Sequence, residues 1–301
     1  MDVLVENYRP TVMPRAGLGF EALHEVNPRL IYAQLSGLGY AGRGGFDLIA
    51  QGMGGIMHVT GEPDGPPTSV GLPICDLGTG MWAVQGILAA LYERQRTGKG
   101  RLVECSLLET AIGFSSWTSA QWLADHEEPT RQGSRHRQNA PYQRMQTKDG
   151  YLMVGVAGEA IWARCAKALG HPEWCEDPRF ATNQARMANR EALEDAMNAV
   201  LRTKTTNDWV EVLEAAGVPC GPAYDYAQMF ADPQVRHRGL VQYGSDAELG
   251  EVPHIRTPIR IGDGVRVRAV APKLGQHNAE IFGRLGVSEA EIKELRTKGV
   301  V

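Results

Sequence analysis

The first hundred residues alternate between short apolar runs and a segment with helical spacing. An apolar run at 2–6 predicts a strand, and the spacing of apolar residues at 19–26 predicts a helix that ends before Pro28. The run 29–36 is apolar on both sides, which is typical of a parallel strand buried on both faces. Strand, helix, strand predicts a βαβ unit and an α/β fold with a doubly wound, Rossmann-like sheet.

The same block continues through a glycine-rich stretch into a long helix. This helix is predicted over 77–95, followed by a strand over 102–106 and a second helix over 107–123. The apolar positions of the long helix follow the i, i+4, i+7 template. They are Leu77, Met81, Val84, Leu88, Leu91 and Tyr92.

A second unit is predicted after a polar, basic stretch. Residues 125–150 have the composition of a linker, and the apolar run 151–157 predicts a buried strand. The helices that follow are predicted at about 160–169, 190–202 and 206–216.

The tail of the chain predicts a return to the first unit. It is extended from Gly250, and Ser288-Glu-Ala-Glu291 is a capping box that opens a final helix. We therefore expect a discontinuous large α/β domain over 1–125 and 250–301, with a linker and a smaller inserted α/β domain over 126–249.

Composition is that of an ordinary folded protein. The 301 residues are 43% hydrophobic and 22% charged, which excludes disorder. The net charge of -4 provides no excess of positive charge to attract nucleic acid or an anionic membrane, so neither is expected as a partner. No apolar run approaches the ~18 residues of a membrane span, and no basic stretch opens a secretory signal. The five cysteines contain no C-x-x-C pair, so we expect reduced thiols and a cytoplasmic location.

Two glycine motifs suggest nucleotide binding and do not meet its requirements. Gly37-Leu-Gly39-Tyr-Ala-Gly42 matches G-x-G-x-x-G, but Arg43-Gly44-Gly45 follows where a helix must begin, which favours a plain glycine loop. Gly98-Lys99 lacks the first glycine of a P-loop, because Glu93 holds that position. The histidines have no ligand spacing on a predicted helix, so no metal site is expected.

One carboxylate stands at the start of the long helix, in Val70-Gly-Leu-Pro-Ile-Cys75-Asp76. Asp76 can be a plain N-cap that accepts amide hydrogen bonds. It can also be a covalent nucleophile toward an activated acyl group, kept ionised by the helix dipole and free amides. Cys75 is the rival nucleophile, but its neighbour is an acid and no histidine is near it in sequence. At this point both interpretations of Asp76 stay open.

Short segments along the whole chain carry a family resemblance. They are 2–10, 30–37, 45–51, 60–67, 75–77, 106–109, 140–143, 149–151 and 272–275. In this order they resemble the family III CoA-transferases, the formyl-CoA and carnitine CoA-transferase group. The α-methylacyl-CoA racemases share that fold.

The resemblance implies a CoA-transferase whose nucleophile is Asp76. In such enzymes the aspartate attacks an acyl-CoA to form a mixed anhydride, CoA thiolate converts this to an aspartyl-CoA thioester, and an acceptor carboxylate takes the CoA. Coenzyme A thioester is then a substrate, and no permanently bound cofactor or metal is implied. The implied partners are an acyl-CoA, a carboxylic acid and a second copy in an interlocked homodimer. The implied CoA-site residues are Asn7, Tyr8, Arg9 and Arg15, with Gly44, Gly45, Phe46 and Asp47 near the pantetheine and acyl groups.

The same resemblance leaves two alternatives. Racemases of this fold pair a histidine with the aspartate, and Phe46 stands in place of that histidine; since phenylalanine exchanges no proton, transfer is favoured. Glu159 stands where racemases have another acid, or is simply an acid at a helix start. Family members carry a further segment before the strand at 2–6, which this chain lacks. The alternatives are therefore a racemase or epimerase, and a truncated, non-catalytic CoA-binding paralogue.

Overall fold

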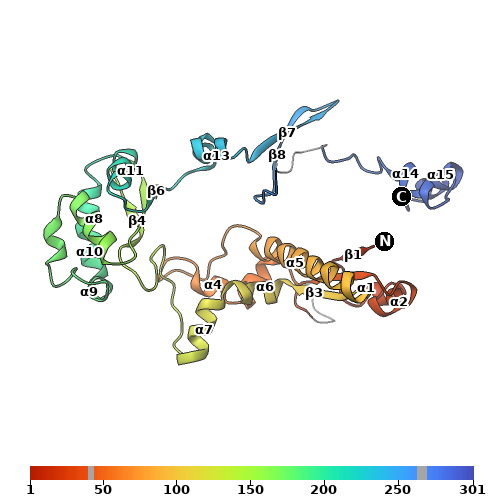
Figure 1. Ribbon diagram of the computed structural model, residues 1–301, viewed down its shortest axis with the longest axis horizontal. Coiled ribbons are helices and arrows are strands. Elements are labelled where there is room, and N and C mark those ends of the chain that lie inside the picture. The colour runs from red at the N-terminus through yellow and green to blue at the C-terminus, as the bar shows by residue number, and fades with distance from the viewer. Residues whose placement is uncertain (40–43, 263–269) are drawn as a thin grey trace. The chain divides into compact units, whose positions relative to one another are not determined.

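The chain forms two compact units of mixed α/β structure (Figure 1). The structure is a computed structural model that describes residues 1–39, 44–262 and 270–301. One unit comprises Met1–Pro222 and the other Ala223–Val301, and each is described by itself. The discontinuous domain division expected from the sequence stays a prediction.

A parallel three-stranded sheet organises the start of the first unit. Its strands are β1 (Val3–Glu6), β2 (Ile31–Ser36) and β3 (Leu102–Ser106), in the order β1-β2-β3. Helix α2 (Phe20–Val26) connects β1 to β2 and packs on the Tyr32 face, with the Phe20 and Tyr32 rings 6.1 Å apart. The short helix α1 (Val12–Arg15) precedes it. The predicted strand, helix and strand are confirmed, and the two strands are parallel as expected.

Helix α5 (Ile74–Thr97) contacts the sheet through small residues. A Cβ at Gly86 would lie 2.6 Å from Val103 Cγ1, so helix and strand approach too closely for a side chain there. The buried positions of α5 are Cys75, Gly78, Thr79, Ala83 and Ala90. The apolar stripe of the helix is exposed instead: Leu77 60%, Met81 62%, Val84 56%, Leu88 60% and Tyr92 80%.

Among the described residues, α5 is also the one helix long and apolar enough to cross a membrane. Its most apolar 18-residue window has a mean hydropathy of 1.4. The sequence expectation concerned uninterrupted apolar runs, which the glycines and Asp76 interrupt here. The window reaches this mean hydropathy because its leucines, isoleucines, valine and alanines outweigh those residues. The helix packs against β2, β3 and α6 of the same unit.

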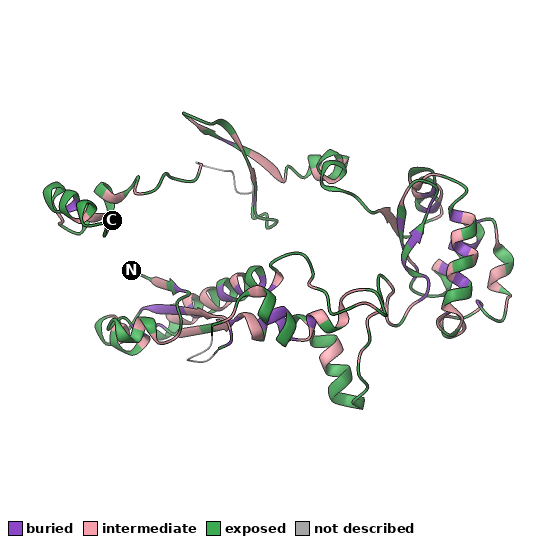
Figure 2. Ribbon diagram, turned by 180° about the vertical axis from the view of Figure 1, so that it is seen from behind, coloured by how far each residue is buried: buried purple, intermediate pink, exposed green. Residues whose placement is uncertain are grey.

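Two short helices and one divided helix complete this part. They are α3 (Asp47–Met53), α4 (Ile56–Val59), α6 (Leu107–Phe114) and α7 (Ser116–Asp125). The single helix expected at 107–123 is divided at Ser115, whose hydroxyl donates to Ile112 O. Ser106 caps α6 by accepting a hydrogen bond from Glu109 N. Helix α7 contains no buried residue (Figure 2).

The rest of the first unit is built on an antiparallel sheet with its own core. The strands are β4 (Tyr142–Gln146), β5 (Tyr151–Gly155) and β6 (Cys220–Pro222), in that order. The linker expected to reach residue 150 ends earlier, because β4 lies inside it. The predicted helices are present as α8 (Glu159–Ala168), α10 (Arg190–Leu201) and α11 (Thr206–Ala215), and further turns are η1 (Pro172–Cys175) and α9 (Asn183–Ala188). They bury Trp162, Leu193, Met197 and Leu213.

The second unit contains a hairpin between short helices. Helices α12 (Tyr226–Ala231) and α13 (Pro233–His237) precede the antiparallel strands β7 (Val241–Asp246) and β8 (Gly250–Ile255). Helices α14 (Asn278–Arg284) and α15 (Glu289–Thr297) follow. The predicted capping box is confirmed, because Ser288 accepts from Glu291 N and the Glu291 carboxylate accepts from Ser288 N.

Candidate functional site

A cavity of about 410 Å³ lies at the carboxyl end of strand β2. In α/β sheets this edge is where ligands bind, because the loops that follow the strands open there. The cavity brings together four of the residues predicted from the sequence. Its lining is Asn7, Leu35, Ser36, Gly37, Gly45, Phe46, Asp76, Thr79 and Leu107.

Asp76 is the third residue of α5 and not its N-cap. The helix begins at Ile74 with Pro73 at the cap position, so the N-cap interpretation was wrong. The Asp76 side chain is exposed at the cavity and does not point into packed hydrocarbon. In its described lining, Asp76 is the one ionisable side chain.

The electrostatics of Asp76 differ from the sequence-based expectation. Partial burial raises the pKa of Asp76 above its ordinary value, and the nearby charge of Asp47 raises it further. The amides expected to hold the Asp76 charge are bonded elsewhere: Asp47 Oδ1 accepts from Cys75 N at 2.7 Å and from Asp76 N at 3.2 Å. The amides at the start of α5 thus bind the Asp47 carboxylate, while the Asp76 carboxylate remains at the cavity.

Two loops meet at one wall of the cavity. A Cβ at Gly37 would lie 2.5 Å from Gly45 N, so the two backbones touch and residue 37 has no room for a side chain. Residues 40–43 of the G-x-G-x-x-G motif lie outside the described residues. Helix α3 begins at Asp47, several residues after the motif, which agrees with the glycine-loop interpretation.

Phe46 and Arg9 flank this wall. Phe46 is 79% exposed and offers an apolar ring to the cavity. The Arg9 guanidinium lies against Gly44, where a Cβ would be 3.7 Å from Nε, and within the described chain it has no carboxylate partner. Tyr8 is 58% exposed and Arg15 lies at the exposed end of α1; neither belongs to the described lining.

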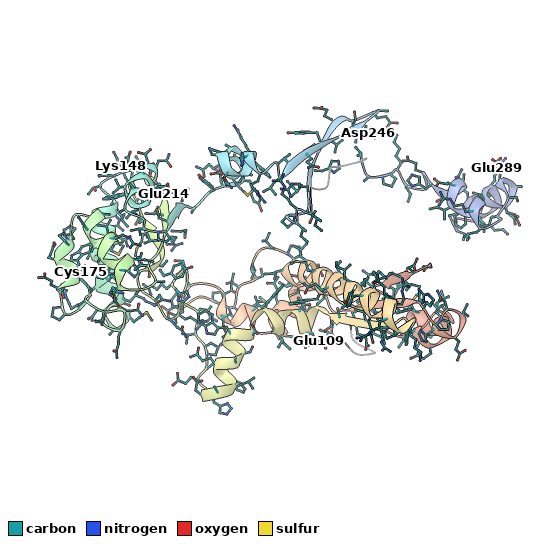
Figure 3. All side chains as sticks on the ribbon, viewed as in Figure 1. Glu109, Lys148, Cys175, Glu214, Asp246 and Glu289 are labelled. Carbon is teal, nitrogen blue, oxygen red and sulfur yellow. The ribbon has the colours of Figure 1, made fainter. Side chains whose placement is uncertain are left out.

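Sequence reasoning missed a hydroxyl residue one turn after the nucleophile candidate. Thr79 Oγ1 lies 2.7 Å from Thr110 Oγ1 and 3.4 Å from Ser106 O, which ties α5 to α6 and the end of β3. Ser106 Oγ in turn donates to Glu109, which is labelled in Figure 3, at 2.6 Å. The i, i+3 spacing from Asp76 was the available signal for Thr79.

Glu159, the first residue of α8, is hydrogen-bonded to other protein groups. Its carboxylate accepts from Asn183 N and from Arg186 Nη1, both at 2.8 Å. Burial acts to raise the pKa of Glu159, but the hydrogen bonds from Arg186 and Asn183 outweigh it, so the pKa lies below its usual range. Both oxygens are used, which favours the structural interpretation of this acid.

No metal-ligand cluster stands out: within the described ranges, no group of three or more His, Cys, Asp or Glu side chains is arranged to hold a metal ion. The five cysteines are free thiols. Fold and cavity therefore define an α/β protein with a single carboxylate presented at the ligand-binding edge of its parallel sheet.

Comparisons with known proteins identify the family. The model of CoA-transferase family III matches residues 1–278. The chain is 37% identical to an acyl-CoA transferase of Fusarium pseudograminearum, over 100% of this chain and 67% of the relative. It is 35% identical to succinyl-CoA:glutarate CoA-transferase of Mus musculus, over 100% of this chain and 70% of the relative. A CAIB/BAIF family protein from Brucella suis superposes with a TM-score of 0.82 at 37% identity, over 94% of this chain and 75% of that one.

The chain therefore belongs to CoA-transferase family III and is a CoA-transferase, as the resemblance implied.

Proposed function

We propose that the enzyme moves CoA from an acyl-CoA to a free carboxylic acid, with Asp76 as the covalent nucleophile. The observation that carries this proposal is the exposed Asp76 carboxylate in the 410 Å³ cavity, alone among ionisable side chains of the described lining. A two-base racemase needs a second proton-exchanging group at the substrate carbon, and Phe46 supplies none.

The proposed reaction proceeds through two covalent states. Asp76 Oδ attacks the thioester carbonyl and CoA thiolate leaves, which gives a mixed anhydride. The thiolate then attacks the Asp76 carbonyl, releases the donor carboxylate and forms an aspartyl-CoA thioester. The acceptor carboxylate attacks this thioester and releases the thiolate again. Attack of the thiolate on the acceptor carbonyl yields the new acyl-CoA and regenerates the Asp76 carboxylate, with no net proton transfer.

The remaining predicted residues have binding roles in this scheme. Arg9 supplies a guanidinium for an anionic group of CoA, since no carboxylate in the described chain neutralises it. Asn7 offers an amide to the thioester region, and Phe46 with the bare backbone of Gly44 and Gly45 gives an apolar path for pantetheine. Tyr8 and Arg15 contact parts of CoA beyond the cavity.

The acceptor class in this proposal is a short dicarboxylic acid. It rests on the name of the mouse relative, a succinyl-CoA:glutarate CoA-transferase. A cavity of 410 Å³ has room for a small acyl group beside the end of pantetheine.

Assembly as an interlocked homodimer, with a discontinuous doubly wound large domain, is part of the same proposal. The exposed apolar stripe of α5 and the absence of any buried residue in α7 support it, because such surfaces are normally covered by another part of an assembly. The free thiols agree with a cytoplasmic location.

Isotope transfer tests the proposal directly. An acceptor acid labelled with ¹⁸O in its carboxylate leaves one labelled oxygen in Asp76 after a complete turnover, and mass spectrometry of the Asp76 peptide detects it. Asp76→Ala abolishes exchange of CoA between labelled acids. Without label in Asp76, or with exchange undiminished in Asp76→Ala, the proposal is wrong.

The same samples separate the alternatives. A racemase exchanges the α-hydrogen of a 2-methylacyl-CoA for deuterium in heavy water without any acceptor acid. A non-catalytic paralogue titrates with CoA in a calorimeter but transfers no label.

A further inference from the structure

The start of helix α5 is capped by a residue from another helix. The cap position is Pro73, and no side chain at that position accepts a hydrogen bond. Asp47, the first residue of α3, accepts from Cys75 N and Asp76 N instead, at 2.7 and 3.2 Å. These are the second and third amides of α5, the ones that an N-cap side chain normally binds.

Asp47 is itself held by a buried amide. Gln51, one turn later in α3 and 2% exposed, donates from Nε2 to Asp47 Oδ2 at 2.5 Å. The same Nε2 donates to Leu72 O at 3.1 Å, and Oε1 accepts from Val70 N at 3.0 Å. Three hydrogen bonds therefore fix the Gln51 amide. Two of them attach the segment that precedes α5 to helix α3.

This arrangement leaves Asp76 without a backbone partner. An acid at the third helical position usually folds back onto the amide of the cap residue. Here that residue is Pro73, which has no N–H, and the next amides belong to Asp47. Within the described chain the Asp76 carboxylate accepts no hydrogen bond, although it lies on the first turn of a 24-residue helix.

We propose that Asp47 and Gln51 act as a positioning pair that occupies the amides of α5 and so keeps the Asp76 carboxylate free for attack at the cavity. This inference rests on the proposed role of Asp76 as nucleophile. It gives Asp47 a positioning role, since both Asp47 oxygens are bonded to protein groups, and the expected place of Asp47 near pantetheine stays a prediction.

The pair also acts through charge. Within the described ranges, the ionisable groups that face Asp76 are Asp47 from α3 and Cys75 from its own helix, whereas Asn7, Ser36 and Thr79 of the cavity are neutral. Because Asp47 contributes to the raised pKa of Asp76, it makes the nucleophile more basic. Because intrinsic nucleophilicity rises with basicity, a more basic carboxylate is the better nucleophile once it is ionised.

Three variants separate position from charge. Asp47→Ala removes both, and we expect kcat to fall about 100-fold with the KM for acyl-CoA unchanged, as for a misplaced reacting group. Asp47→Asn keeps an oxygen for the amides but removes the charge, so kcat falls less and the acid limb of the pH profile moves to lower pH. Gln51→Leu loosens the support without changing a charge, so kcat falls while the acid limb stays in place. Asp64→Asn, which neutralises an exposed acid outside the described cavity lining, serves as the matched control with unchanged kinetics.

Thermal unfolding of each variant confirms that a folded enzyme is compared. A rise in KM for acyl-CoA with kcat unchanged in Asp47→Ala would show that Asp47 binds CoA, and would overturn the positioning role. An unshifted acid limb in Asp47→Asn would overturn the role of its charge. Failure of the proposed function itself is distinguishable, because it appears as full exchange activity in Asp76→Ala.

Discussion

The thiol of Cys75 and the carboxylate of Asp76 are adjacent in sequence and lie in opposite environments. Cys75 is fully buried, whereas Asp76 is exposed at the cavity. Burial raises the pKa of Cys75 to about 11, and the charges of Asp47 and Asp76 contribute. The first turn of α5 thus exposes the Asp76 carboxylate at the cavity and buries the Cys75 thiol.

Replacement of Cys75 tests this division. Roughly one thiol in a thousand is ionised at pH 8 for a pKa near 11, so we expect Cys75→Ala to keep kcat within a few-fold of the unmodified enzyme. Steady-state CoA exchange measures this, with Asp76→Ala as the comparison. A loss in Cys75→Ala as large as that in Asp76→Ala would make the thiol part of the chemistry.

The raised pKa of Asp76 also predicts a stability effect. The folded state holds the Asp76 proton more tightly than the unfolded state, so stability is lost as pH rises from the ordinary value of 3.8 through the folded pKa. Asp76→Asn removes this loss. We expect its urea midpoint to exceed that of the unmodified enzyme at neutral pH, and the difference to shrink toward pH 4. An equal or lower midpoint at neutral pH would contradict the upward shift.

Glu159 is predicted to be structural. Arg186 is fully buried and Glu159 is its carboxylate partner, so Glu159→Ala leaves a buried guanidinium without its counter-charge. We expect a loss of about 1.5–3 kcal/mol in the free energy of unfolding, the usual contribution of a hydrogen bond to a charged group. Thermal and urea unfolding measure it, and kcat stays unchanged at temperatures where the variant is folded.

Glu191→Ala is the control for Glu159, since Glu191 is an exposed acid in the first turn of α10. A fall in kcat with stability intact in Glu159→Ala would instead make Glu159 a site acid, as in the racemase alternative.

The exposed stripe of α5 predicts an interface. Leu88 is 60% exposed at the middle of the stripe, and a charge there opposes burial against a second copy. We expect Leu88→Glu to sediment as a monomer, whereas Val26→Glu, which places the same charge on an exposed apolar side chain of α2 outside the stripe, leaves the assembly unchanged. A dimer of undiminished stability in Leu88→Glu would place the interface elsewhere.

Local patterns predicted most of the fold, and failed where packing overrode them. The βαβ start was predictable because each strand is apolar along its own length. Strand β4 was missed because its inward residues include Gln143, which is 5% exposed although polar. The burial of α5 by its small residues was not predictable, since the large apolar stripe on its other side gives the stronger signal.

The site, too, could be predicted from local sequence patterns but not where it depends on residues far apart in the sequence. Asp76 was placed near the start of a helix, and its cavity also contains Asn7, Gly45 and Phe46, whose roles in CoA binding stay predictions. Its electrostatics were predicted wrongly, because the carboxylate that takes the helix amides lies 28 residues away from Cys75 along the chain. No periodicity in a single sequence reveals such a pairing.

Two glycines of α5 give a matched test of how closely the helix approaches the sheet. At Gly86 a Cβ would meet Val103 Cγ1 at 2.6 Å, and valine has little rotamer freedom to move away. Gly86→Ala is therefore expected to cost about 1–3 kcal/mol in the free energy of unfolding, as overpacked substitutions do. At Gly80 a Cβ meets nothing within 4 Å, so Gly80→Ala keeps the contacts and gains helix propensity, about 0.5–1 kcal/mol. Urea unfolding of the two variants should move in opposite directions; stabilisation by both would mean that α5 lies farther from β3 than the structure shows.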